Sequence, residues 1–146
     1  MIKRDALYSS KTDEWETPQD FFDELNREFS FDLDVCATGS NAKCNRYYSL
    51  EEDGLRQPWI GRVWCNPPYG NEIPLWLQKA HDEIISNAEL IVILIPARTD
   101  TRWFHKYVYN KPGIEIRFVK GRLKFGGAAY NAPFPSMIVI FRRTDK

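Results

Sequence analysis

Four consecutive residues, Asn66-Pro67-Pro68-Tyr69, combine groups that can bind and activate a flat amino group. They follow the apolar residues 63–65, which predict the end of a β-strand. Each proline fixes its own φ near about −65° and biases the preceding residue toward an extended conformation, so Asn66 leaves the strand in a preset direction. Because neither proline has an N–H, the turn offers the Asn66 side-chain oxygen and the Asn66 and Pro67 carbonyls as acceptors, with the ring of Tyr69 beside them.

The chemistry that such a receptor serves is methylation of an amine conjugated to a ring or a carbonyl. The nitrogen lone pair is delocalised, but two acceptors that hold both N–H bonds draw it out of the plane as a sulfonium methyl approaches in line. The alternative interpretation is a Pro-Pro turn with a packing tyrosine. The position of the motif, after an apolar run and before a helical pattern, favours a ligand site, because ligands of open α/β sheets bind outside the carboxyl ends of strands.

The length and composition describe one soluble domain. Of the 146 residues, 43% are hydrophobic and 27% are charged, which suits a single domain over residues 1–146, with an irregular segment over residues 1–13. The sequence has neither a membrane-spanning apolar run nor a signal-peptide core, so we expect a cytoplasmic protein. Cys36, Cys44 and Cys65 lack paired metal-binding spacing, and we expect reduced thiols and no bound metal.

The formal net charge is zero, but the charges are unevenly distributed along the chain. Residues 1–96 carry 17 acidic and 9 basic side chains, whereas residues 97–146 carry 3 acidic and 11 basic ones. A basic C-terminal third suits a polyanionic partner, although the charges can also be spread over several solvated faces. We favour nucleic acid as this partner because basic and aromatic residues are interleaved in one cluster. The cluster contains Arg117, Lys120, Arg122 and Lys124 with Phe118 and Phe125.

Alternating helix and strand patterns place the motif within an α/β sheet. Residues 18–29 predict a helix with Thr17 as its N-cap and Pro18 in its first position. Apolar residues at helical spacing predict a second helix over residues 73–86, and Asp100 is the predicted cap of a third. This order predicts a three-layer α/β sandwich with a mostly parallel sheet, in which the final strand can run antiparallel. Strands are expected over residues 31–37, 62–65, 90–95, 114–119 and 137–141.

Two carboxylates are candidates for contact with a ligand of the predicted sheet. Asp34 is close to the carboxyl end of the first predicted strand, where an acidic side chain can accept from a ribose hydroxyl or from the ammonium of a bound amino-acid moiety. A solvated loop residue is the alternative. Asp53 lies in a turn-rich segment and either contacts the ligand or is simply exposed. His81 and His105 lie on predicted helices and are interpreted as structural residues.

Four motifs, taken in order, resemble those of one enzyme family, the phage-type (Dam-like) DNA N6-adenine methyltransferases. The resemblance covers residues 14–142. The chain differs from many such enzymes because it has no glycine-rich loop after the first strand and only a short region before Asn66. The motifs are Glu16-Thr17-Pro18, Phe31-Asp32-Leu33-Asp34-Val35-Cys36-Ala37, Asn66-Pro67-Pro68-Tyr69, and Gly121-Arg122-Leu123-Lys124-Phe125 before Asn131-Ala132-Pro133-Phe134-Pro135-Ser136.

The resemblance implies a compact Rossmann-like class I methyltransferase fold and S-adenosylmethionine as cofactor. Thr17 and Pro18 would lie at the methionine end of the cofactor. Asp34 would hold the cofactor's polar groups, and Asp53 would face its adenine. The implied cofactor-binding set is completed by Cys36, Ala37 and Asn66.

The implied reaction transfers a methyl group to the exocyclic N6 amine of adenine in double-stranded DNA. The resemblance places Asn66, Pro67, Pro68 and Tyr69 in the catalytic turn. Asn66 and Pro67 would hold the target amine, and Tyr69 would stack on the adenine with Phe125 on its opposite face. The base must first be flipped out, because its amine is already hydrogen-bonded inside the duplex.

The chain is too short to hold a separate base-reading domain of ordinary size. Recognition would therefore depend on basic residues near the active site, and we expect a short or relaxed target sequence, or a homodimer that shares the duplex. The resemblance also implies a phage- or prophage-encoded enzyme that works in the bacterial host cell. The candidate DNA-binding residues are Arg98, Arg102, Lys106, Arg122, Lys124 and Phe125.

Two other functions remain open from the sequence. Protein glutamine (amide) methyltransferases share the Asn-Pro-Pro-Tyr motif, although they have less need of a basic C-terminal third. A non-catalytic nucleic-acid-binding or cofactor-sensing domain on the same fold would bind DNA with a steep salt dependence and transfer no methyl group.

Overall fold

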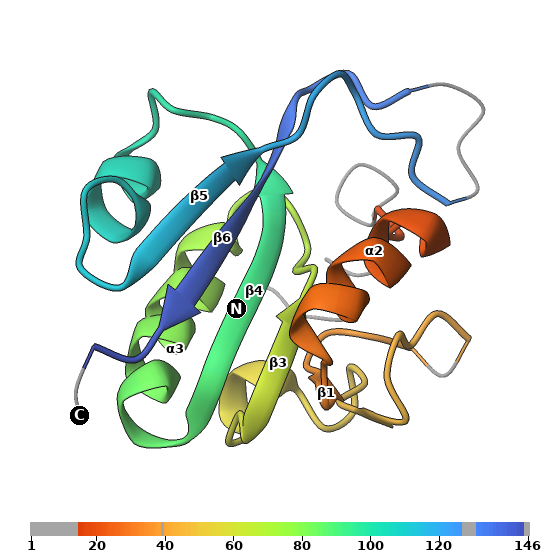
Figure 1. The fold of residues 1–146 in the computed structure, drawn as a ribbon, viewed down its shortest axis with the longest axis vertical. Coiled ribbons are helices and arrows are strands. Elements are labelled where there is room, and N and C mark those ends of the chain that lie inside the picture. The colour runs from red at the N-terminus through yellow and green to blue at the C-terminus, as the bar shows by residue number, and fades with distance from the viewer. Residues whose placement is uncertain (1–14, 39, 127–130, 145–146) are drawn as a thin grey trace.

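The computed structural model describes residues 15–38, 40–126 and 131–144, and a six-stranded sheet forms its centre (Figure 1). The strand order is β2-β1-β3-β4-β6-β5. Neighbouring strands from β2 to β4 are parallel, whereas β6 runs antiparallel to both β4 and β5. The predicted mostly parallel sheet with an antiparallel last strand is confirmed. In chain order the strands are β1 (Leu33–Asp34), β2 (Arg46–Tyr47), β3 (Gly61–Cys65), β4 (Ala88–Pro96), β5 (Ile114–Phe118) and β6 (Ser136–Arg142).

Helices cover both faces of this sheet. In Figure 1, α2 (Gln19–Phe29) lies in front of the strands and α3 (Ile73–Ser86) lies behind them. The π-helix η2 (Phe104–Val108) and the short 3-10 helix η1 (Gly54–Arg56) both pack against α3. The result is the three-layer arrangement that the sequence predicts.

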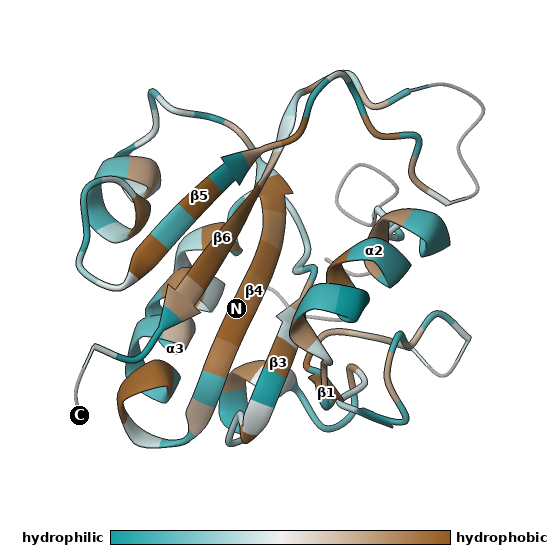
Figure 2. Cartoon of the chain, viewed as in Figure 1, coloured by the Kyte–Doolittle hydropathy of each residue, from teal (hydrophilic) through white to brown (hydrophobic). Residues whose placement is uncertain are grey.

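The bounds of α3 agree with the prediction, and those of β4 nearly so. Pro74 lies in the first turn of α3, where its missing N–H costs no helical hydrogen bond. Ile73, Trp76 and Ile84 belong to the apolar stripe that this helix buries against the sheet. In β4 every residue except Glu89 is buried, as expected for a central strand covered on both faces. Figure 2 shows β4 and β6 as hydrophobic along most of their length.

The start of α2 differs from the prediction. Its N-cap is Pro18, and no side chain caps the helix. The prediction that Thr17 is the N-cap was wrong, because its hydroxyl instead accepts a hydrogen bond from Asn66 Nδ2 at 2.9 Å. At the other end of α2, Ser30 adopts a left-handed conformation with φ 53° and donates its N–H to the Asn26 carbonyl, which is a common way to end a helix.

The first strand is shorter than the predicted span of residues 31–37. Sheet-like backbone hydrogen bonds run from Asp32 to Val35, whose N–H groups donate to carbonyls of the β3 strand. The next N–H, that of Cys36, donates to the Asp34 carboxylate instead. This side-chain bond replaces a ladder bond at Cys36, although Ala37 again donates its N–H to the Tyr48 carbonyl next to β2.

The third helix forms where the sequence predicts it, but Asp100 does not provide its first cap. Thr101 Oγ1 accepts from the N–H of Phe104 at 3.2 Å. Phe104 and Val108 are buried, as their spacing predicts. The His81 ring on α3 joins this helix to the core, because its Nε2 lies 2.7 Å from the Tyr107 carbonyl oxygen.

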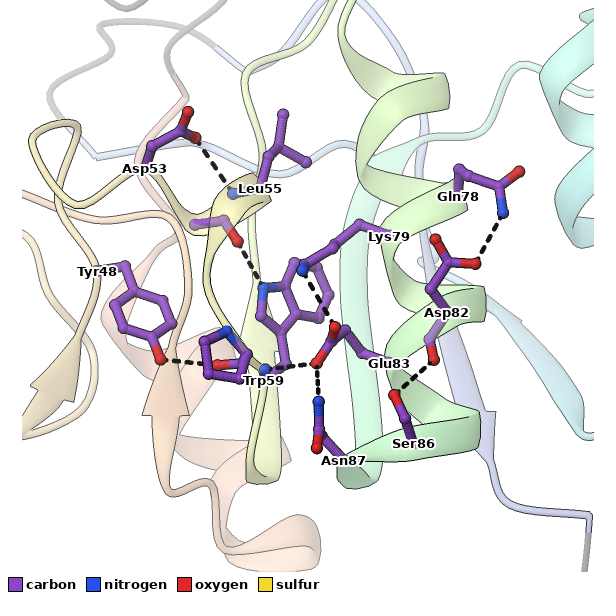
Figure 3. Close-up of polar contacts among 12 residues, drawn as sticks. Tyr48, Asp53, Leu55, Trp59, Gln78, Lys79, Asp82, Glu83, Ser86 and Asn87 are labelled. Carbon is purple, nitrogen blue, oxygen red and sulfur yellow. Dashed lines mark hydrogen bonds and ion pairs between the residues drawn. The ribbon is translucent and has the colours of Figure 1, made fainter.

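Glu83 on α3 anchors the segment that leads into β3 (Figure 3). Its carboxylate accepts from the Trp59 N–H at 2.7 Å, from Asn87 Nδ2 at 2.9 Å and from Lys79 Nζ at 3.1 Å. Burial raises the pKa of Glu83, but these three hydrogen bonds outweigh it, so the net pKa is lowered. Trp59 in turn donates its Nε1–H to the Gly54 carbonyl at 2.8 Å. The network fixes the approach to the strand that ends at the Asn-Pro-Pro-Tyr turn.

The described residues contain neither a membrane-spanning helix nor a cluster of metal ligands. No helix among them combines the length and the apolar character needed to cross a membrane. In the same residues, His, Cys, Asp and Glu side chains form no group of three suited to a metal ion. Cys36, Cys44 and Cys65 are free thiols.

Candidate active site

A pocket opens at the carboxyl ends of β1 and β3, where the sequence predicts the ligand site. The turn after β3 forms one wall, and the residues that follow β1 form another. Residues 15–17, which we call the N-terminal strap, close a third side. We call this hollow the β1–β3 pocket. It is lined by Trp15, Glu16, Thr17, Asp34, Cys36, Ala37, Thr38, Asn41, Lys43, Trp64, Asn66, Pro67 and Pro68.

The Asn66 side chain presents an acceptor that the protein does not use. Its Nδ2 donates to the Trp15 carbonyl at 2.5 Å and to Thr17 Oγ1 at 2.9 Å. Its Oδ1 is buried and has no hydrogen-bond partner within the described residues. Such an atom typically costs a fold about 1–3 kcal/mol. A buried acceptor left open beside a pocket is what the predicted amine receptor requires.

Tyr69 is buried in an aromatic cluster that consists of Trp15, Tyr69, Phe125 and Phe134. The tyrosine is 3% exposed, and its hydroxyl donates to the Leu94 carbonyl at 3.2 Å. Burial raises the pKa of this hydroxyl well above its usual value, so it remains a donor at neutral pH. The ring therefore lies beside the acceptor turn, as predicted, but neighbouring side chains cover it.

Phe125, predicted to face Tyr69 across the base, is 2% exposed and contacts the same cluster. Its ring centroid lies 6.2 Å from that of Tyr69, with an angle of 83° between the planes. Phe134 meets Tyr69 at 5.7 Å and 75°. These are edge-to-face contacts, which stabilise aromatic pairs. The two predicted stacking rings thus come together, but they are not parallel, and their role as a base sandwich stays a prediction.

Asp34 is a buried carboxylate on the wall of the β1–β3 pocket. It is 2% exposed, and its two oxygens accept from the N–H groups of Cys36 at 3.2 Å and Lys43 at 3.0 Å. Desolvation raises the pKa of Asp34 to about 6, although both hydrogen bonds act in the opposite direction. A carboxylate can accept about four hydrogen bonds, so capacity remains for a ligand.

Two residues of the predicted cofactor set lie outside the lining of this pocket. Asp53 accepts from the Leu55 N–H at 3.2 Å and caps η1, so its local structure explains it without a ligand. Pro18 is the N-cap of α2, next to the strap. The pocket does bring together Thr17, Asp34 and Asn66, with Cys36 and Ala37. Their contact with a cofactor stays a prediction.

Sequence reasoning did not identify several residues of the pocket wall, among them Trp15, Thr38, Asn41 and Lys43. Thr38 and Asn41 exchange hydrogen bonds between side chain and backbone, at 2.6 Å and 3.3 Å. Runs of Thr, Gly, Ser and Asn favour such turns, so the sequence signal for this loop was present. Lys43 closes the wall through its backbone N–H, which donates to Asp34, and a backbone role of that kind leaves no trace in the residue type.

Two predicted DNA-binding arginines each contact the segment of residues 132–134. The Arg98 guanidinium lies 5.8 Å from the centroid of the Phe134 ring. One Arg122 nitrogen lies 3.5 Å from the Ala132 carbonyl oxygen. Both arginines are exposed, as are the remaining predicted cations, Arg102, Lys106 and Lys124.

Arg117 does not contribute free positive charge to the predicted basic cluster. It forms ion pairs with Glu28 at 2.8 Å and Glu115 at 2.6 Å. Hydrogen bonds to these two carboxylates raise the pKa of Arg117 further above its usual value. Phe118 on the same strand is 61% exposed. The cationic surface is therefore carried by the residues after β5 and β4 and not by β5 itself.

Comparison with known proteins identifies the family. The sequence matches the family described as DNA N-6-adenine-methyltransferase (Dam) over residues 5–146. It is 30% identical to the DNA N-6-adenine-methyltransferase of Haemophilus phage HP1 over 149 residues, which covers 97% of this chain and 85% of the relative. It is 34% identical to the DNA N-6-adenine-methyltransferase of Escherichia phage T1 over 96 residues, which covers 63% of this chain and 39% of that relative.

A solved structure supports the fold assignment. The protein PH1948 from Pyrococcus horikoshii, described as a candidate RNA methyltransferase, superimposes with a TM-score of 0.61 at 13% identity and covers 97% of this chain and 96% of its own. At this identity the likeness concerns the fold, which is the Rossmann-like methyltransferase fold. The sequence match over residues 5–146 places the chain more closely: it belongs to the DNA N-6-adenine-methyltransferase (Dam) family.

Proposed function

We propose that this chain transfers a methyl group from S-adenosylmethionine to the N6 amine of an adenine in double-stranded DNA, and that Asn66 Oδ1 accepts from that amine. The family is named for N6-adenine methylation of DNA, and this favours DNA over a protein amide as substrate. The observation that carries the residue assignment is the buried Asn66 Oδ1 without a partner among the described residues, on the wall of the β1–β3 pocket.

The Asn66 side chain and the Pro67 carbonyl act on the amine as a pair of acceptors. S-adenosylmethionine, when bound, supplies the methyl group from a sulfonium centre. As the amine nitrogen forms its bond to carbon, it gains positive charge and its N–H bonds become stronger donors. The two acceptors therefore bind the transition state more tightly than the ground state, which lowers the barrier. The surplus N6 proton then passes to water.

The β1–β3 pocket has the chemistry to hold the cationic end of this cofactor. Asp34, Trp15 and Trp64 all contribute to its wall. A carboxylate and aromatic faces both attract cations, and S-adenosylmethionine carries a sulfonium and an ammonium. The predicted roles of Cys36 and Ala37 at the cofactor also fit this pocket, and we retain them as proposals. We do not assign Asp53 to it, because its carboxylate caps η1.

Cofactor affinity is expected to depend on pH through Asp34. Its pKa of about 6 in the free protein means that the carboxyl is mostly protonated at pH 5 and ionised at pH 8. A cationic ligand prefers the ionised form, so S-adenosylmethionine should bind about 10-fold more weakly at pH 5 than at pH 7 or above. Isothermal titration calorimetry at closely spaced pH values from 5 to 8 measures this change.

The Asp34→Asn variant is the control for this pH dependence. The amide keeps the shape of the carboxyl but does not titrate, so its binding should be weak at every pH and should lose the step near pH 6. Because the folded pKa of Asp34 lies above that of an unfolded chain, this group stabilises the free fold below about pH 4 and loses this contribution as the pH rises through about 6. If S-adenosylmethionine binding showed the same pH dependence in both proteins, Asp34 would be excluded as the cause.

The aromatic cluster provides a place for the flipped adenine. Tyr69 lies next to the acceptor pair in sequence, and Phe125 and Phe134 cover it by edge contacts. We propose that the extruded base separates these rings and stacks on Tyr69. Base–aromatic stacking is worth about 1–3 kcal/mol per base, which can offset the lost edge contacts and part of the cost of unstacking.

DNA contact is assigned to the exposed cations beside this cluster. Arg98 contacts Phe134 and Arg122 contacts Ala132, and Arg102, Lys106 and Lys124 are also exposed. Such residues bind phosphates and position the duplex, but few of them are available to read bases. We therefore propose a short or relaxed target sequence, or a homodimer on the duplex. The phage relatives support a role in the cytoplasm of a bacterial host.

The proposed activity is tested by incubating the chain with methyl-labelled S-adenosylmethionine and unmethylated duplex DNA, followed by nucleoside analysis. We expect the label in N6-methyldeoxyadenosine. A matched duplex in which 2-aminopurine replaces adenine lacks the N6 amine and should remain unlabelled. Label in methylcytosine, or in added protein instead of DNA, would contradict the proposal.

A further inference from the structure

The Trp15 carbonyl shows which end of the Asn66 amide carries the NH₂ group. The Trp15 carbonyl oxygen lies 2.5 Å from one end of that amide. A carbonyl can only accept, so the amide atom facing it must be the NH₂ group. The amide oxygen consequently points away from the strap, where it is buried without a partner among the described residues.

Thr17 holds the same NH₂ group from a second direction. Its side-chain oxygen lies 2.9 Å from Asn66 Nδ2, and the residue is 4% exposed. The sequence position of Thr17 suggests a helix cap, yet α2 has no side-chain cap. The hydroxyl is thus directed to a residue 49 positions away in the sequence, which sets the rotamer and the flip state of the catalytic amide together with Trp15.

We propose that Thr17 is a positioning residue for methyl transfer: its hydroxyl fixes the Asn66 amide so that Oδ1 faces the target amine. The inference rests on the proposed function, and it differs from the cofactor-binding role that the sequence predicts for Thr17. A free amide can rotate about its terminal torsion and present NH₂, a donor, to an amine that needs an acceptor. Two anchors on Nδ2 remove this unproductive orientation.

The N-terminal strap also connects this amide to the segment that carries Phe125. Gly126 donates its N–H to the Glu16 carbonyl at 2.8 Å, in an isolated antiparallel bridge. The Trp15 ring contacts Phe125 with centroids 5.4 Å apart. Asn66 is thus held by the same short strap that contacts the predicted base-binding ring, so its orientation is set where the cofactor pocket and the aromatic cluster meet.

The test compares Thr17→Val with Thr17→Ser. Valine keeps the shape and the burial but removes the acceptor, whereas serine keeps the hydroxyl. We expect Thr17→Val to slow single-turnover methyl transfer at saturating cofactor by about 10-fold or more, since small misplacements of catalytic groups have effects of this order or larger. Its Kd for S-adenosylmethionine should stay within about 3-fold of the original, and Thr17→Ser should restore most of the rate. Thr144→Val, two residues after the end of β6, is the matched control.

Two results would overturn the proposal. One is an unchanged single-turnover rate in Thr17→Val. The other is a weakened Kd with a normal rate at saturating cofactor, which would assign Thr17 to cofactor binding.

A second readout does not depend on activity. In ¹⁵N-labelled protein, the side-chain NH₂ signal of Asn66, assigned by its loss in Asn66→Ala, should exchange slowly with solvent and should shift and exchange faster in Thr17→Val but not in Thr17→Ser. If the chain transferred no methyl group while this pattern held, the proposed function would fail and the positioning contact would stand. An unprotected Asn66 signal in the unsubstituted protein would refute the contact itself.

Discussion

Replacing Asn66 by alanine is expected to slow methyl transfer to DNA by about 100- to 1,000-fold, the range seen when one preorganised polar group is removed from a transition-state site. The substitution deletes the open Oδ1 acceptor and leaves the Pro67 carbonyl to hold the amine alone. It also removes the hydrogen bond from Nδ2 to the Trp15 carbonyl, which measures 2.5 Å in the intact protein. Single-turnover transfer of labelled methyl groups at saturating cofactor measures the loss directly.

Two controls separate the loss of chemistry from a loss of structure. Asn71→Ala makes the same change at an exposed position of the same β3–α3 connection and should leave the rate unchanged. Thermal unfolding of Asn66→Ala should reveal a moderate loss of stability, about 1–3 kcal/mol, because the substitution removes the hydrogen bonds from Nδ2 to Trp15 and Thr17. A rate within about 3-fold of the original in folded Asn66→Ala would mean that other acceptors hold the amine.

The second large effect is expected at Gly54, where alanine should reduce the free energy of unfolding by more than about 3 kcal/mol. A Cβ at this position would lie 2.0 Å from the Val35 carbonyl oxygen and 3.2 Å from the Trp76 ring. The backbone of η1 therefore passes against β1 at a distance that only glycine permits. Because Val35 adjoins Asp34 in the wall of the β1–β3 pocket, a shift there should also weaken cofactor binding.

Gly121→Ala is the matched control for Gly54→Ala. Gly121 has φ +74°, and a Cβ there would meet nothing within 4 Å. In Gly121→Ala, the loss in free energy of unfolding should come from the left-handed backbone alone and should be about 1–2 kcal/mol. Urea unfolding of both variants compares a steric with a conformational effect. If Gly54→Ala were no less stable than Gly121→Ala, the close packing of η1 on β1 would be disproved.

The parts of the fold that the sequence predicts well are those with a regular apolar pattern. α3 has a clear helical period, and β4 is a continuous apolar run, so both appear at or near their predicted bounds. The position of Asn66 at the end of β3 follows from the apolar residues before it and the prolines after it. These signals are local, and each survives in the folded protein because tertiary packing acts in the same direction.

The predictions that failed are those in which a distant residue competes with a local partner. Thr17 before Pro18 has the pattern of a helix cap, but Asn66 takes its side-chain oxygen. Nothing near Thr17 in the sequence reveals this long-range bond. Asp53 precedes η1, and its carboxylate accepts from the N–H of Leu55, a local bond typical of aspartate in turns; its contact with the cofactor stays a prediction.

Arg117 shows a case in which the sequence held more information than the charge count used. Side chains two apart on a strand share a face, so Glu115 and Arg117 were predictable neighbours on β5, and they form an ion pair. The second acidic partner of Arg117 is Glu28 on α2, which lies 89 residues away in the sequence. Counting charges along a chain overestimates a cationic surface when strands bring acids and bases together.

The strand order β4-β6-β5 has a consequence for synthesis of the chain. β5 emerges from the ribosome before β6, yet within the described sheet its neighbour is β6, which pairs with β4 on its other side. β5 therefore cannot pair with the sheet until β6 has been synthesised and has inserted between β5 and β4. Until then its unpaired edge can pair with other chains and aggregate. Glu115 and Arg117 alternate with apolar residues in β5, and such charged side chains discourage this pairing.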